Sequence, residues 1–179
     1  AEAGGPEFTR EYDVAGVPYG KRGRLMEEQI ELLRKLWTEP RTTFKGEFHN
    51  LENIAFGPKP AQPNSPPIWI ANNPQIFPLD TDVVQRMLRR VGRMAYGWQT
   101  CLATPDEYRT LLGRIREYAK EAGRNPEEIV PSYQVLLNVN RDRQAARREA
   151  LEFINKYYVT TYKSVEESMG LRAGSSSRC

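Results

Sequence analysis

The chain of 179 residues has little of what several classes of protein require. It has one histidine and two cysteines, Cys101 and Cys179, which stand far apart and form no C-x-x-C pair. Neither a zinc site nor a disulfide framework is therefore indicated, and a reducing, cytoplasmic compartment is the simplest expectation. Lys and Arg number 26 and Asp and Glu 23, largely interspersed, a balance that argues against a nucleic-acid partner.

Long apolar runs and nucleophile motifs are also missing. No apolar stretch approaches the roughly 18 residues that a membrane span needs, so we expect no membrane partner. No Ser-His-Asp set, no phosphate-binding Walker loop and no isolated carboxylate pair stands out. The catalytic residues are accordingly unknown from the sequence, and no metal site is expected.

The two ends of the chain differ in kind from the middle. The opening residues "AEAGGPEF" form a Gly-rich stretch without an initial Met, so we expect them to lie inside a longer protein. The closing "GSSSRC" has the composition of a flexible tail. We expect one domain over residues 1–171 and a tail over 172–179.

Periodicity predicts an alternation of helices and strands. Expected helices span 24–37, 81–95, 104–123 and a segment that Asp142 caps, and expected strands span 68–71, 95–103 and 133–139. A hairpin is expected over 43–56, and a capping box over Ser164–Glu167. Such alternation is typical of a parallel sheet built from right-handed βαβ units. Three strands are few for such a sheet, so we expect part of the structure to be missing from this chain.

The stretch "SPPIWIANNPQ", residues 65–75, carries no charge. Two prolines lead into a short apolar run, Ile68 to Ile70, and the expected strand ends on Ala71, followed by Asn72 and Asn73. Small and amide residues after a parallel strand permit a ligand to approach the backbone. Alternatively, Asn-Asn-Pro is ordinary turn chemistry.

Several segments together resemble the bacterial-luciferase-like monooxygenases. They are "GVPYGKRGRLMEEQIELLRKLWTE", "FKGEFHNLENIAFGPKPAQPNSPPIWIANNPQ", "RRVGRMAYGWQT" and "TPDEYRTLLGRIREYAKEAGRNPEEI". The resemblance implies an α/β fold, a partial (β/α)₈ TIM barrel comprising approximately strands five to seven with their helices, the C-terminal half of the domain. It implies FMN or a deazaflavin as cofactor, which would carry the redox chemistry.

The resemblance also implies cofactor-binding residues. Ala71, Asn72 and Asn73 occupy places where backbone N–H groups of the family meet the cofactor's phosphate. Gly97 and Trp98 match a Gly-Trp pair beside the cofactor, with the tryptophan lining the barrel mouth.

The pair departs from the family's pattern at one position, because Tyr96 replaces the acid that usually precedes the glycine. A strand-end bulge with a core aromatic is the alternative for this pair.

Arg22 and Arg24 precede the first long helix, where the family places basic groups near substrate or phosphate. Arginine suits an anion because its planar fork binds bidentately. A solvated helix start is the alternative. The lone His49 is assigned no catalytic role.

The function implied is part of a flavin-dependent monooxygenase or oxidoreductase that acts on a small organic substrate with reduced flavin and dioxygen. A deazaflavin-dependent hydride-transfer oxidoreductase is the alternative. We expect weak or no cofactor binding and no turnover by this chain alone. Rivals from other classes are a non-catalytic half-barrel that assembles with itself or a complementary half, and an anion-binding domain using Arg86, Arg89, Arg90 and Arg93.

Overall fold

The fold combines a parallel sheet, a small hairpin and five α-helices within the residues described by the computed structural model, which are 9–101, 103–135 and 137–157. The helices are α1 Thr9–Val14, α2 Arg22–Thr38, α3 Asp82–Met94, α4 Pro105–Glu121 and α5 Arg143–Tyr157. The strands are β1 Thr42–Lys45, β2 Asn50–Ile54, β3 Trp69–Ala71, β4 Gly97–Thr100 and β5 Val130–Tyr133. Short 3₁₀ helices lie at η2 Tyr19–Lys21, η3 Pro74–Ile76 and η4 Pro126–Glu128.

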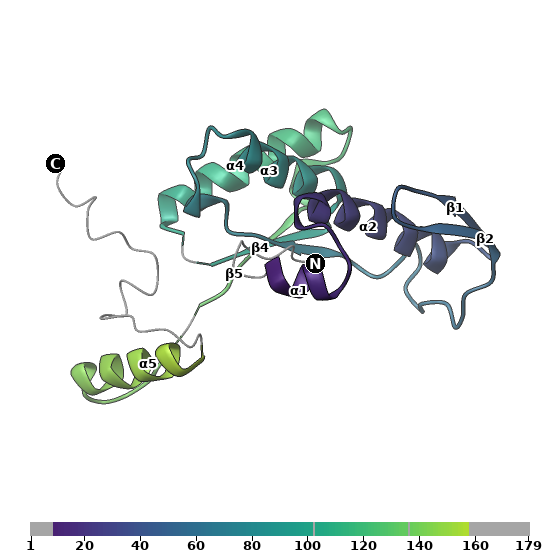
Figure 1. The fold of residues 1–179 in the computed structure, drawn as a ribbon. Helices are drawn as coiled ribbons and strands as arrows, with labels where there is room; N and C mark the ends of the chain where they lie inside the picture. The colour runs from purple at the N-terminus through teal and green to yellow at the C-terminus, as the bar shows by residue number, and fades with distance from the viewer. Residues whose placement is uncertain (1–8, 102, 136, 158–179) are drawn as a thin grey trace.

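The parallel sheet has the order β3-β4-β5, with Ile70 opposite Trp98 and Trp98 opposite Pro131. Helices α3 and α4 cover one of its faces (Figure 1). Their apolar stripes, with Val84 and Leu88 from α3, pack on Ile70 and Trp98 to form the core. The expected βαβ alternation is thus confirmed over β3, α3, β4, α4 and β5, as is the α/β class.

The helices that flank the sheet begin at caps that the sequence encodes. Thr104 and Glu107 form a capping box at α4, with the Thr104 hydroxyl accepting from the Glu107 N–H and the Glu107 carboxylate accepting from the Thr104 N–H. Pro105 takes the first helical position, where no N–H is needed. Gly123 follows the helix with a φ of 73°, a left-handed conformation that glycine adopts without strain. These signals fix where the chain returns toward β5.

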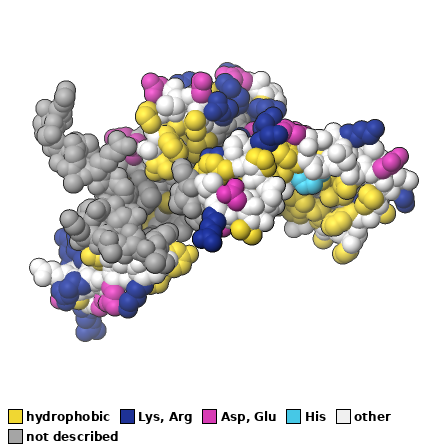
Figure 2. Space-filling model, viewed as in Figure 1, with side chains coloured by type: hydrophobic (Ala, Val, Ile, Leu, Met, Phe, Trp, Pro, Cys, Tyr) yellow, Lys and Arg dark blue, Asp and Glu magenta, His cyan; other side chains and the backbone are white. Residues whose placement is uncertain are grey.

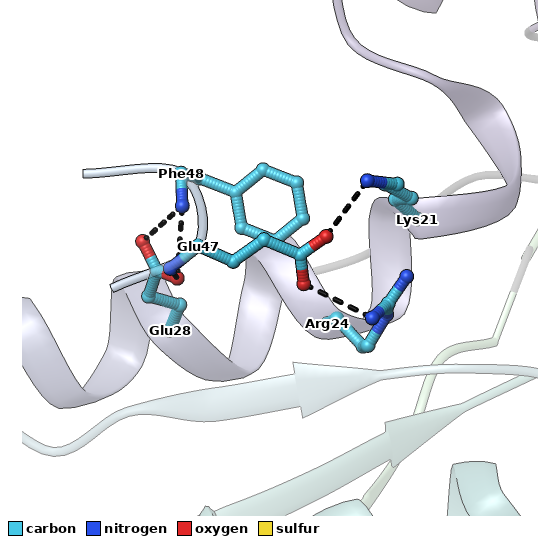
Figure 3. Close-up of polar contacts among 5 residues, drawn as sticks. All are labelled: Lys21, Arg24, Glu28, Glu47 and Phe48. Atoms are coloured by element: carbon cyan, nitrogen blue, oxygen red, sulfur yellow. Dashed lines mark hydrogen bonds and ion pairs between the residues drawn. The ribbon is translucent and has the colours of Figure 1, made fainter.

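A carboxylate joins the hairpin β1-β2 to α2. The Glu28 carboxylate accepts hydrogen bonds from the backbone N–H groups of Glu47, Phe48 and His49, at 2.6 to 3.1 Å, and from the His49 ring at 2.9 Å. Lys21 and Arg24 hold the Glu47 carboxylate from the other side (Figure 3). Figure 2 shows apolar side chains gathered over this end of the molecule. The hairpin is thereby fixed as an outlying unit on α2.

The third strand lies earlier than the sequence predicts. We expected it over 133–139, but β5 ends at Tyr133, and Val135, Leu137 and Val139 are 67, 82 and 84% exposed. A proline such as Pro131 disfavours a strand in general, because its nitrogen cannot donate to a ladder. The N–H groups of Val130 and Gln134 donate to the carbonyls of Tyr96, just before β4, and of Thr100, at its end. The nitrogen of Pro131 therefore faces the open edge, where no donor is needed.

Other bounds differ by smaller amounts, and some predictions lie outside the described residues. The second strand is Gly97–Thr100 rather than 95–103, and α2 begins at Arg22, so Arg22 and Arg24 lie within the helix rather than before it. The capping box at Ser164–Glu167 and the tail 172–179 fall outside the described part of the chain. Figure 1 shows α5 apart from the sheet. No helix in the described part is both long and apolar enough to cross a bilayer.

Candidate functional site

The carboxyl ends of β3 and β4 meet in a network of amide and hydroxyl groups. The backbone N–H of Asn72 donates to the Gln99 carbonyl at 3.1 Å, which extends the strand pairing by one residue. At the next residue, the Asn73 side-chain oxygen accepts from the Thr100 hydroxyl and from the Cys101 N–H, both at 3.0 Å. Gln75 donates from its side chain to the Cys101 carbonyl. The residues after β3 are therefore bound to the end of β4.

This network fixes the direction of the Asn73 amide group. Because the Cys101 backbone N–H can only donate, the atom that faces it is the amide oxygen. The Asn73 NH₂ group then points away from β4. Among the described residues, neither this NH₂ group nor the backbone N–H of Asn73 donates a hydrogen bond. Asn73 thus presents N–H donors at the carboxyl rim of the sheet.

Asn72 and Trp98 lie on the helix side of the sheet. The Trp98 side chain is fully buried, and its indole N–H donates to the Asn72 side-chain oxygen at 2.9 Å. Its ring stacks on Tyr108 of α4, with 5.3 Å between centroids. The indole therefore faces the helix layer, and the buried hydrogen bond fixes the Asn72 side chain. Contact with a cofactor stays a prediction for both residues.

Gly97 and Ala71 lie on the opposite face of the sheet. Gly97 pairs with Trp69 in the parallel register, and a Cβ built on Gly97 would stand 2.6 Å from the Trp69 indole ring. Packing alone therefore requires a residue without a side chain at 97. Ala71 is half-buried two residues beyond Trp69 on the same face. Because the Ala71 side chain is a single methyl group, little of it projects from that face of the sheet beside the Asn73 donors.

Tyr96, the residue that departs from the family's pattern, is partly exposed before β4. Its ring meets Trp69 edge-on at 6.2 Å between centroids. It therefore belongs to the amino end of the sheet, at the other end of β4 from Thr100.

The structure brings Arg22 and Arg24 to other partners. The Arg22 guanidinium lies 3.7 Å from the centre of the Tyr19 ring and donates to the Tyr19 carbonyl at 3.0 Å. Arg24 pairs with Glu47 of the hairpin connection at 3.0 Å, with the Arg24 side chain 63% exposed. These contacts explain both arginines at the start of α2, and their role toward a cofactor stays a prediction.

A shallow depression of about 500 Å³ lies beside the rim, between Ala103, Tyr108, Arg109 and Tyr133. The Tyr133 hydroxyl donates to the Ala103 carbonyl at 2.9 Å, and its ring meets Tyr108 edge-on. Burial raises the pKa of Tyr108, against a smaller opposing effect of Arg116. The phenol therefore stays neutral and acts as an aromatic wall.

Sequence reasoning missed Tyr108 and Tyr133, together with Thr100 and Gln75. Two signals in the sequence were available: Tyr108 follows the capping box of a predicted helix, and Thr100 lies near the end of a predicted strand. Across the described residues, no three His, Cys, Asp or Glu side chains come together as a metal site requires. The site offers amide donors and aromatic walls rather than acid–base groups, which suits the binding of a cofactor that brings its own reactivity.

Comparison with known proteins agrees with this architecture. A sequence profile of the luciferase-like monooxygenases matches residues 3–175. An uncharacterized protein of Mycobacterium tuberculosis is 33% identical over 68% of this chain and 38% of its own length. The phthiodiolone/phenolphthiodiolone dimycocerosates ketoreductase of Mycobacterium kansasii is 32% identical over 78% of this chain and 36% of its own length. The chain therefore spans less than two fifths of these curated relatives.

Solved structures share the fold at lower identity. A monooxygenase from Streptomyces bottropensis aligns with a TM-score of 0.65 at 18% identity, over 90% of this chain and 46% of that one. A coenzyme F420-dependent tetrahydromethanopterin reductase from Methanopyrus kandleri aligns with a TM-score of 0.63 at 16% identity, over 94% of this chain and 49% of that one. With the profile match over nearly its whole length, the chain belongs to the luciferase-like monooxygenase family.

Proposed function

We propose that the chain is the C-terminal part of a barrel oxidoreductase and supplies the phosphate end of its FMN or deazaflavin site. The observation that supports this most is Asn73, whose amide oxygen is bound to β4 while its NH₂ group and backbone N–H remain as donors at the carboxyl rim. In a parallel α/β sheet, ligands bind at this rim.

The residues present fit a phosphate group in part. Asn73 offers two kinds of N–H donor, and Ala71 leaves room for a close approach to the backbone. Asn72 and Trp98 contribute by position, since their buried hydrogen bond holds the turn after β3. Gly97 contributes by letting Trp69 lie flat on the sheet. Arg22 and Arg24, assigned in this proposal as outer contacts, would have to leave Tyr19 and Glu47 to reach a ligand.

The bound cofactor would supply either oxygen activation by reduced flavin or hydride transfer by a deazaflavin, acting on a small organic substrate. The chain's own residues bind and orient one end of it. Because the chain spans less than two fifths of its curated relatives, the remaining contacts and the substrate pocket are assigned to residues outside it. We therefore expect weak binding and no turnover from this chain alone.

Recognition of the phosphate end is tested by comparing FMN with riboflavin, which lacks the phosphate. The chain is titrated with each, and binding is followed by the quenching of flavin fluorescence. FMN should bind about tenfold more tightly than riboflavin, as expected for hydrogen bonds to a charged group. Asn73→Ala should remove the difference, and Asn50→Ala, an exposed change in the hairpin, should keep it.

Two results would count against the proposal. Equal affinity of the wild-type chain for FMN and riboflavin would show that the chain does not recognise the phosphate. Tight, saturable binding with turnover would contradict the proposal that residues outside the chain supply the other contacts.

A second candidate function, a non-catalytic assembly module, has support from the edge of the sheet. β5 is an edge strand in the described fold, and Val135, Leu137 and Val139 beyond it are largely exposed. Unpaired edges and apolar residues of this kind favour pairing with another chain. A second copy of the chain, forming a homo-oligomer, or a complementary half-barrel would pair with the strand edge and cover the exposed apolar residues.

A further inference from the structure

An open cavity, about as exposed to solvent as the depression beside the carboxyl rim, lies at the amino ends of the strands, opposite to the rim that carries Asn73. It has a volume of about 430 Å³. Ile68 and Tyr96, the residues that precede β3 and β4, form part of its wall, and Arg34 of α2 and Arg124 border it. Two cations thus face one cavity that the proposed cofactor site does not use.

Both guanidiniums are held in place by the end of α3. Arg34 donates to the Met94 carbonyl. Arg124 donates to the carbonyls of Gly92 and Ala95, at 2.6 and 2.7 Å. The last carbonyls of a helix carry partial negative charge and lack helical partners, so cations are favoured there. The two arginines are therefore oriented before any ligand binds.

Their charge is not matched by a carboxylate in contact. Within the described ranges, the side-chain hydrogen bonds of Arg34 and Arg124 go to the carbonyls of Gly92, Met94 and Ala95 at the end of α3, which leaves most of their N–H donors available. Burial, and after it the positive charge of Arg34, lowers the pKa of Arg124, while the charge of Glu128 opposes the shift. An anion between the guanidiniums would relieve this repulsion.

Apolar residues form most of the rest of the wall. Pro66 and Pro67 line it beside Ile68 and the Tyr96 ring. Ser65, also in the wall, has a φ of 123°, a backbone conformation that residues with side chains rarely adopt. Such conformations are costly and occur preferentially at ligand sites.

We propose that this cavity binds a small organic anion. Its carboxylate or phosphate group accepts hydrogen bonds from Arg34 and Arg124, and its apolar part lies against Pro66, Pro67 and the Tyr96 ring. Guanidinium groups suit this class because their planar forks bind an oxyanion bidentately. The site is independent of the proposed cofactor site, because the two lie at opposite ends of the strands.

The test uses benzoate, inorganic phosphate and benzyl alcohol as probes at constant ionic strength. Binding is followed by the NMR signals of the Arg34 and Arg124 side-chain N–H groups. Benzoate should give saturable shifts at both arginines and phosphate weaker ones, while benzyl alcohol, which has no charge, should give none. This order follows from an anionic head group combined with an apolar contact.

Two variants localise the effect. Tyr96→Glu places a carboxylate inside the cavity at a partly exposed position, so it should weaken benzoate binding at least about tenfold. Arg86→Gln makes the same change in net charge at an exposed position on α3 and should leave binding unchanged. Equal responses in all three proteins, or shifts that never saturate, would overturn the proposal. Neither variant removes the arginines that hold the end of α3, so both should fold.

Discussion

At the scale of single residues, Gly97 shows how a candidate ligand contact can be a packing requirement. Its missing side chain is where the Trp69 indole lies. Gly97→Ala should destabilise the chain by roughly 1–3 kcal/mol, since added volume in a packed site forces neighbours to move. Denaturant unfolding followed by Trp fluorescence measures the change.

Gly113→Ala is the matched control for this prediction. Gly113 lies inside α4, and a Cβ there meets nothing within 4 Å. This change should stabilise the chain by about 0.5–1 kcal/mol, because alanine favours a helix over glycine. If both variants shift the unfolding midpoint in the same direction, the contact with Trp69 does not determine the residue at 97.

The sequence predicted that small and amide residues follow a strand at 71–73, and the structure places them at the end of β3, but the pattern did not reveal which partners these side chains have. Small and amide residues after a strand predicted a rim site, and the structure shows Asn73 with free donors at that rim. The pattern did not show that Asn72 turns to the helix side, because its direction depends on the Trp98 indole N–H, 26 residues away. The directions of the Arg22 and Arg24 side chains likewise depend on their contacts with Tyr19 and Glu47.

At the scale of elements, the attachment of the hairpin to α2 should depend on pH through Glu28. Burial alone would raise the pKa of Glu28, but the His49 ring and three backbone N–H groups outweigh it, so the pKa lies below its usual value. Because the folded-state pKa is lowered, the stabilisation is complete above the unfolded value of about 4.5. It is lost as the pH falls through the folded-state pKa.

This loss is measurable as faster hydrogen exchange of the Phe48 and His49 amides, corrected for the intrinsic effect of pH. Glu28→Gln should raise their exchange at neutral pH and flatten the pH dependence below about 4.5. Glu31→Gln, on the exposed side of the same helix, is the control. An unchanged acid profile in Glu28→Gln would mean that another group controls the hairpin.

The elements of the fold were largely predictable because their signals are local. The capping box of α4, the stripes of α3 and the alternation around Lys45 each lie within one segment. The position of β5 was not predictable in this way, because its four residues include Pro131. A proline fits there only because β5 is an edge strand, which depends on the arrangement of the whole sheet. The apolar residues from Val135 to Val139 drew the prediction away from it.

At the scale of the whole molecule, exposed apolar residues beyond β5 predict self-association. We expect light scattering after size exclusion to give a mass above 20.6 kDa, the mass of one chain, with the excess growing with concentration. Replacing Val135 and Val139 with Ser should reduce it, because both side chains are largely exposed and contribute little to the core. A concentration-independent monomer would count against the assembly module.

The central claim is that the carboxyl rim of this sheet, through Asn73, holds the phosphate end of a flavin or deazaflavin. Its most direct test is a titration of the ¹⁵N-labelled chain with FMN, followed by NMR. We predict shifts of the backbone N–H of Asn73, of its side-chain NH₂ group and of the Cys101 N–H, with weak, saturable binding. Shifts confined to Tyr96, Arg34 and Arg124 at the opposite end of the strands, or no saturable shift, would contradict it.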